Sequence, residues 1–315
     1  MRKVLLATTA LVALGGVSAA SADISVSVSN EFKYVSWSDN TAETGGVNKT
    51  DWSNDSTVKI SASTVTDNGL SMSSYAANDT TRSFDDYGFS IAGDFGTIGF
   101  QGSDSGDAFE TAADVTPDEG QTISTAISTT LYVMPADAHV ADSSISYKSP
   151  DINGFQFAVG AATNGASDAS SMGAQYSMTS GDATITVKYA ASSGGKATTG
   201  AAEVEATSMG LVAAYGNATV TLASNTKENG TYDFTGDSIG ITYKMSDSMT
   251  VSAYTGTTDD AKDSTHEVKD TGLGVAYTIT PGLTLSVTHN DWSIKDTSVT
   301  NEDGSRMAIA LDVSF

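Results

Sequence analysis

The chain has 315 residues, of which 38 are acidic and 15 are basic, and it has no cysteine. This length is enough for two ordinary domains or for one large β domain, and without disulfides its stability must come from packing and backbone pairing. The strong negative charge makes nucleic acid a poor partner, and we expect none.

The first 22 residues have the pattern of a secretory signal peptide. Arg2 and Lys3 precede an apolar run from residue 4 to residue 17, and small residues at 20–22 form the motif that signal peptidase cleaves. We therefore predict a signal peptide at 1–22 and a mature chain at 23–315; an amphipathic or buried N-terminal helix is the alternative. Without Arg2 and Lys3, 13 basic residues stand against 38 acidic ones, and this net charge of −25 favours cations over anions in any aqueous passage.

Apolar residues alternate with small or polar residues through most of the mature chain. The pattern begins with Ile24, Val26 and Val28, which alternate with serines, and it recurs in about sixteen segments up to Phe315. Such alternation predicts β-strands with one apolar face and one polar face. After the signal peptide there is no run of about 18 apolar residues, so the sequence predicts no membrane-spanning helix.

The connections between these segments alternate in length. Short connections with turn chemistry follow every second strand, such as TDNG at 66–69 and TPG at 280–282. Long polar segments lie between them, such as 38–51, 104–141, 226–236 and 257–269. Tight turns at one end and long loops at the other are typical of outer-membrane barrels. A secreted β-solenoid or sandwich is the alternative, although the sequence has no fixed repeat and no Greek-key pattern.

The last ten residues, RMAIALDVSF, are the clearest strand. One side is wholly apolar, whereas the other is small or polar and includes Arg306 and Asp312. This pattern fits a tilted strand between lipid and water. We expect the strand to close the barrel against the first one, and we expect the new ammonium of Asp23 to lie near the carboxylate of Phe315.

These features together resemble a known family, the Gram-negative outer-membrane general-diffusion porins, and most closely the sixteen-stranded porins of α-proteobacteria. The resemblance spans the mature chain and rests on the opening strand at 23–34, the segment YGFSIAGDFGTIGFQG at 87–102, the long third loop and the terminal strand that ends in Phe315. It implies an all-β, sixteen-stranded antiparallel transmembrane β-barrel whose third long loop folds inward. It also implies a homotrimer in the cell outer membrane, with outer-membrane lipid, lipopolysaccharide and small hydrophilic solutes as partners.

Residues 104–141 are the expected constriction loop of this barrel. The segment has no lysine or arginine, and loops of this length are usually functional or disordered. We expect several of its carboxylates to face the narrowest water and to repel anions; the candidates are Asp104, Asp107, Glu110, Asp114, Asp118 and Glu119. Its stretch at 123–134 is apolar enough to anchor the loop against a wall or a neighbour. A solvated loop on the outer surface is the alternative.

Strand parity predicts which basic side chains face the lumen. Because the first, second, fourth and last strands are neighbours in a closed barrel, a basic wall opposite the loop has four candidates: Lys33, Lys59, Arg82 and Arg306. Lys148, Lys188 and Lys244 also have lumen parity on their strands. The alternative for the wall residues is local pairing with acids such as Glu31 and Asp312.

The function that fits best is passive diffusion of small hydrophilic solutes and ions through a water-filled pore with a weak cation preference. A plugged structural or adhesive outer-membrane barrel and a pore selective for one nutrient are the alternatives. We expect no enzyme, because His139, His266 and His289 are far apart in the sequence and no GxSxG motif is present. We expect no cofactor. Calcium binding at the acidic loops stays an open alternative, although the spacing of a DxDxDG loop is absent.

Overall fold

A computed structural model describes residues 23–39, 48–78, 84–101, 144–163, 168–194, 203–230, 232–262, 267–295 and 302–315. These residues form sixteen β-strands and no helix that could cross a membrane. The strands are β1 (Asp23–Asp39), β2 (Asn48–Val65), β3 (Ser71–Asn78), β4 (Phe84–Gly93), β5 (Gly96–Gln101), β6 (Ser144–Lys148), β7 (Phe155–Thr163), β8 (Asp168–Ser180), β9 (Ala183–Gly194), β10 (Val204–Tyr215), β11 (Ala218–Glu228), β12 (Asp233–Ser246), β13 (Met249–Asp260), β14 (Glu267–Thr280), β15 (Leu283–Lys295) and β16 (Glu302–Ser314).

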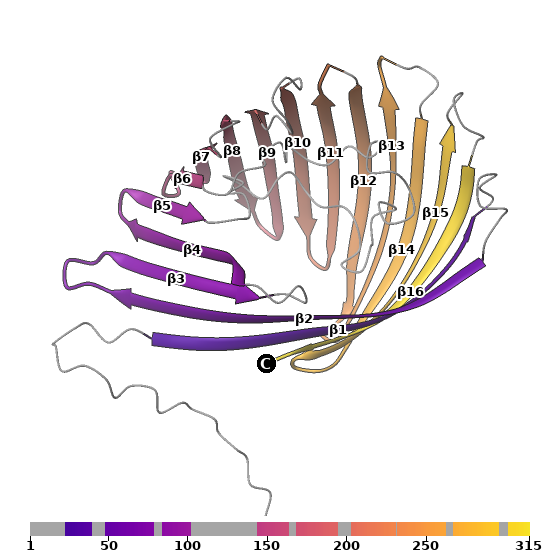
Figure 1. Cartoon of the computed structure of the whole chain (residues 1–315), viewed down its shortest axis with the longest axis horizontal. Helices are drawn as coiled ribbons and strands as arrows, with labels where there is room; N and C mark the ends of the chain where they lie inside the picture. Colours follow the sequence, from indigo (N-terminus) through magenta and orange to yellow (C-terminus); the bar gives the residue numbers. More distant parts are fainter. Residues whose placement is uncertain are drawn as a thin grey trace, which may run out of the picture.

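The strands form one closed antiparallel barrel in which each strand pairs with its neighbours in the sequence and β1 also pairs with β16. Figure 1 shows successive strands side by side around the sheet, with β16 returning to β1. Closure leaves the sheet without a free lateral edge. The predicted sixteen-stranded up-and-down barrel is therefore confirmed.

The two faces of each strand differ in chemistry. On β14, Leu273, Val275 and Tyr277 are exposed on one parity, whereas Asp270 and Gly272 are buried on the other. The same alternation places large exposed apolar side chains on the outer face of most strands. Burying apolar surface is worth roughly 25 cal/mol per Å², so this outer belt is stable against hydrocarbon rather than water. The other parity faces the lumen.

Aromatic rings on the lumen side of the wall lie over glycines of the next strand. A Cβ at Gly272 would overlap the ring of Tyr254, and a Cβ at Gly304 would overlap the ring of Trp292. Only glycine leaves room for such a close approach. Trp292 also packs with Val268 and Ile294 in an inward apolar cluster whose members are 4–6% exposed.

The strands extend farther into the predicted long connections than the sequence indicates. β2 begins at Asn48 and β12 at Asp233, although the sequence places loops at 38–51 and 226–236. The backbone continues its ladder there, but the outward residues beyond the apolar belt are polar. Hydrophobic alternation therefore disappears before the strand ends.

The first and last strands pair with a stagger. Phe315 exchanges both backbone hydrogen bonds with Val28, whereas Asp23 lies opposite Ser63 of β2. The structure thus confirms pairing of β1 with β16 but does not bring Asp23 next to Phe315, and the expected charge clasp is wrong. Closing a barrel of tilted strands requires such a shift in register, which a plain matching of the two chain ends does not take into account.

Candidate functional site: the inner wall of the barrel

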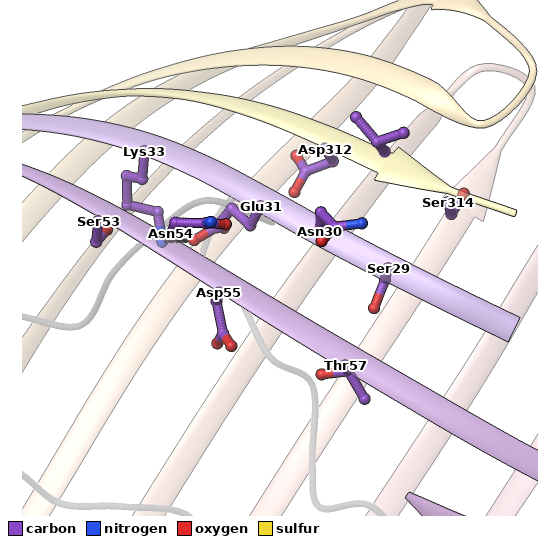
Figure 2. A pocket seen from close by; sticks show the side chains of 11 residues that line it. Ser29, Asn30, Glu31, Lys33, Ser53, Asn54, Asp55, Thr57, Asp312 and Ser314 are labelled. Carbon is purple, nitrogen blue, oxygen red and sulfur yellow. Dashed lines mark ion pairs between the residues drawn. The ribbon is translucent and has the colours of Figure 1, made fainter. Parts of the chain in front are cut away.

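Three strands at the seam of the barrel enclose a polar recess of about 550 Å³. Figure 2 shows its side chains, which come from β1, β2 and β16. The residues with lumen parity that line it are Ser29, Glu31, Lys33, Ser53, Asp55, Thr57, Asp312 and Ser314. The recess is therefore part of the water-facing wall of the channel.

Three carboxylates form a row across this recess. Glu31 of β1 lies directly opposite Asp55 of β2 and directly opposite Asp312 of β16. Side chains paired in this way have Cβ atoms about 4.5–5.5 Å apart, and like charges at that separation repel each other. The row concentrates negative charge on the wall where the sequence predicted a basic surface.

Lys33 forms an ion pair with one of these carboxylates. Its Nζ lies 2.5 Å from Oε1 of Glu31, and the residue is 5% exposed. This is the local pairing that the sequence left open for the wall residues. The described lining of the recess therefore has three carboxylates and one lysine.

Lys59 faces the lumen beside the recess. Its Nζ lies 4.4 Å from the centre of the Tyr75 ring, a cation–π contact. Tyr75 in turn lies over Gly88, where a Cβ would meet the ring. The aromatic ring fixes the position of this ammonium on the wall.

Arg306 is 9% exposed on the lumen face of β16, and its register partner on β15 is Asn290. A polar network continues from Asn290 along the wall. The Asn290 amide donates a hydrogen bond to the Tyr254 hydroxyl, which donates at 2.6 Å to Oδ2 of Asp270. The network spans β13 to β15 because Gly272 leaves space for the Tyr254 ring.

The structure describes three of the predicted site residues on the basic wall and none of the predicted loop carboxylates. Lys33, Lys59 and Arg306 lie on one sector formed by β16, β1 and β2, as their parity predicted. The remaining wall and loop candidates lie outside the described residues: Arg82, Asp104, Asp107, Glu110, Asp114, Asp118 and Glu119. Their roles stay predictions.

Sequence reasoning missed Asp55 and the network of Tyr254 and Asp270. Asp55 has the same parity as Lys59, so starting the predicted second strand a few residues earlier would have placed Asp55 in the lumen. Tyr254 and Asp270 flank a segment that the sequence assigned to a loop. Trp292 also faces the lumen and is 6% exposed. Among the described residues, no group of three or more His, Asp or Glu side chains could hold a metal ion.

A closed barrel with an apolar outer belt and a polar, charged inner wall defines a transmembrane channel. Residues 7–296 match the family model of the Gram-negative porins, and the chain belongs to this family. It is accordingly an outer-membrane channel protein. A comparison with curated proteins gives no match to this chain.

Solved structures share the fold. A loop L8 deletion mutant of OmpT, an outer membrane protein of Vibrio cholerae, superimposes with a TM-score of 0.71 at 14% identity, covering 93% of this chain and 99% of that one. The anion-selective porin from Comamonas acidovorans gives 0.65 at 14% identity, with 93% and 100% covered. A trimer form of the Vibrio cholerae OmpT gives 0.60 at 12% identity, with 93% and 99% covered. At these identities the likeness shows the fold alone.

Proposed function

We propose that the barrel is an open pore for passive diffusion of small hydrophilic solutes and ions, with a weak cation preference. The observation that carries the cation preference is the row of Asp55, Glu31 and Asp312, which brings three carboxylates together on adjacent strands of the inner wall. The mature net charge of −25 acts in the same direction. Between Arg306 and Asp312, the inward residues of β16 are the small Ala308 and Ala310, which occupy little of the lumen.

Reconstitution in a planar bilayer tests this proposal. Under a potassium chloride gradient at neutral pH, the reversal potential is expected to show potassium permeating faster than chloride. A strong anion preference would contradict the charge argument. Conductance near zero would favour a plugged structural or adhesive barrel, and block of the current by one solute at low concentration would favour a substrate-selective pore.

We also propose that residues 104–141 fold into the lumen and narrow it, with their carboxylates facing the water. The inward apolar cluster of Val268, Trp292 and Ile294 supports this proposal, because large apolar side chains are stable on a lumen wall only when something covers them. The apolar stretch at 123–134 is the segment we expect to pack there.

The absence of native cysteine allows a direct test of the loop position. A double variant with Leu131→Cys and Ile294→Cys is expected to form a disulfide under mild oxidation. The matched control combines Leu131→Cys with Val287→Cys, whose side chain lies on the outer face of the same strand. Equal cross-linking in both variants, or none in the first, contradicts an inward loop at this cluster.

A homotrimer is the proposed assembly. The outer faces of β1 and β2 support it, since Asn30, Asn54 and Ser56 interrupt the apolar belt there. Asn30 lies between Val28 and Phe32 along its strand, whereas no Asn, Ser, Thr or charged residue lies between two large apolar ones at the described outward positions of β4 to β16. An unsatisfied polar group in hydrocarbon costs several kcal/mol, roughly 2 to 7, so this sector is better covered by another copy of the chain. Trp52 is 76% exposed beside it and would be buried in such an interface.

The oligomeric state of Asn54→Trp, measured by light scattering in detergent, tests this interface. The bulky side chain is expected to weaken the trimer, whereas Met209→Trp on the outer face of β10 leaves it intact. If Asn54→Trp assembles like the unsubstituted protein, β2 does not lie at the interface.

The remaining proposals concern the cellular context. We propose export through a cleaved signal peptide at 1–22 and contact of the outer belt with outer-membrane lipid and lipopolysaccharide. Calcium is proposed only for the acidic loops, through oxygen ligands. Channel chemistry requires no covalent step, and we propose that the protein has no enzymatic activity.

A further inference from the structure

Closure of the barrel covers the edge of β1 only as far as β16 reaches. Phe315 meets Val28 there, whereas β1 continues to Asp23 at the turn end of the barrel. Figure 1 shows β1 running past the C-terminus in this direction. We call residues 23–27 the β1 overhang. β2 pairs with one side of the overhang, and no strand among the described residues pairs with its other side.

The overhang directs backbone groups toward its unpaired side. Within an antiparallel strand, the N–H and C=O groups of one residue point to the same neighbour, and this direction alternates from residue to residue. Val28 exchanges both of its hydrogen bonds with Phe315, so Ile24 and Val26 direct their backbone groups to the same side, where β16 no longer lies. Two donors and two acceptors therefore lie on an open strand edge, and none of them has a backbone partner among the described residues.

The side chains of the overhang alternate like those of the rest of the strand. Ile24 and Val26 share the outward parity of Val28 and are 56% and 58% exposed, whereas the serines between them have lumen parity. Open strand edges in natural proteins usually carry a proline, a lysine or a β-bulge that blocks further pairing. The overhang has the sequence DISVS and a regular register with β2, so it has none of these protective features.

A further strand is what satisfies both the backbone and the side chains of this edge. Water hydrogen-bonds the open backbone groups but leaves Ile24 and Val26 exposed, and lipid covers these side chains but leaves the backbone groups without partners. An extended segment antiparallel to β1 does both, because it pairs with the backbone and places its own outward side chains beside the two apolar ones. The position of β16 sets the direction of such a segment, since it continues in line with Phe315.

We propose that the β1 overhang is a docking site for an extended segment of a partner protein, which adds to β1 as a further strand. The overhang lies at the turn end of the barrel, and in outer-membrane barrels the turns face the periplasm, so the partner is a periplasmic protein. The parity of the overhang specifies the segment. Its residues opposite Ile24 and Val26 are apolar, the residues between them are small or polar, and it contains no proline. Docking needs no ion flow, so the inference is independent of the proposed pore.

Binding of a synthetic peptide tests the site. The probe is a fluorescent peptide of alternating threonine and valine, and fluorescence anisotropy measures its binding to the barrel in detergent. Val26→Pro removes an N–H group that faces the open side and leaves the hydrogen bonds to β2 in place, so this variant is expected to bind the peptide at least about tenfold more weakly. Val26→Ala keeps the N–H group and is the matched control, with an expected change of less than about threefold. Equal binding to the proline variant and the unsubstituted protein, or no binding to the unsubstituted protein, overturns the proposal.

Methylated peptides give a second test without any change in the protein. N-methylation of the valines, which lie opposite Ile24 and Val26, blocks the hydrogen bonds to β1, whereas N-methylation of the threonines blocks only the far edge of the peptide. The first peptide is expected to lose binding and the second to retain it. Similar affinities for both peptides would mean adhesion to the apolar surface, and strand addition would be wrong.

Two further proteins separate a periplasmic partner from other occupants of the edge. Extending the C-terminus by Thr-Val-Thr-Val-Thr continues β16 along the overhang, so the extended protein is expected to exclude the peptide. Unchanged binding to the extended protein would place the peptide elsewhere and overturn the proposal. If the peptide binds dissociated Asn54→Trp subunits but not the assembled unsubstituted protein, another copy of the chain covers the overhang and the periplasmic partner is excluded.

Discussion

The ring of Tyr254 on β13 lies over Gly272 on β14. The Tyr254 hydroxyl donates a hydrogen bond to Asp270 of β14 and accepts one from the Asn290 amide of β15. The glycine is thus a structural requirement of the polar network. Gly272→Ala is expected to destabilise the barrel by about 1–3 kcal/mol, because the ring must move and its hydrogen bonds break. Urea unfolding in lipid vesicles measures this change.

A double-variant comparison controls for other effects of the alanine. In a Tyr254→Ala background the ring is absent, so Gly272→Ala should cost much less than in the unsubstituted protein. Equal losses in both backgrounds would show that the ring does not limit position 272.

The pair of Lys33 and Glu31 gives a second prediction. Glu31→Gln removes the carboxylate that lies 2.5 Å from an ammonium that is 5% exposed, and a loss of about 1–3 kcal/mol in unfolding free energy is expected. Replacing both charges, with Glu31→Leu and Lys33→Met, should recover most of that stability because no buried charge remains. A double variant as unstable as the single one would contradict the electrostatic explanation.

The staggered seam revises the expected behaviour of the C-terminus. Removing Phe315 deletes the residue that exchanges two backbone hydrogen bonds with Val28, so the melting temperature of the folded form should fall. Adding one glycine after Phe315 should leave it unchanged, because β1 continues beyond that point toward Asp23 and the added residue meets no end of the sheet. A marked decrease in the melting temperature after the addition would instead support an ion pair between the Asp23 ammonium and the C-terminal carboxylate.

A lysine joins two connections at the loop end of the barrel. The Lys262 ammonium donates to the carbonyl oxygen of Tyr232 at 3.2 Å and to Oε1 of Glu228 at 3.4 Å, and also to the Asn229 carbonyl. Because this site is exposed, Lys262→Ala should change global stability by less than about 1 kcal/mol. Local opening should nevertheless speed proteolysis between β11 and β12, measured by limited digestion and mass spectrometry. Lys269→Ala, which removes an exposed lysine from the outer face of β14, should leave that cleavage rate unchanged.

The sequence predicts the strands, their order and the closed barrel because each strand contributes a local alternation that is independent of the others. Lys33 and Arg306 could likewise be placed in the lumen from parity alone. The stagger between β1 and β16 could not be predicted, because it depends on the tilt accumulated around the whole ring. Register also determines that Glu31 faces both Asp55 and Asp312, so an acidic row that parity alone did not reveal lies among the predicted basic residues Lys33, Lys59 and Arg306.

The stagger at the seam makes each hydrogen-bonded row a spiral. One row passes from Gln156 near the turn end of β7 through Lys188 and climbs strand by strand to Asp39 at the loop end of β1, by way of Gln175, Gly210, Ala223, Ser238, Gly256, Asp270, Trp292 and Gly304. A step sideways to the next strand is therefore also a step along the pore axis. Residues of one row therefore lie at successively different depths in the membrane. A solute that follows one row around the wall moves from one side of the membrane toward the other.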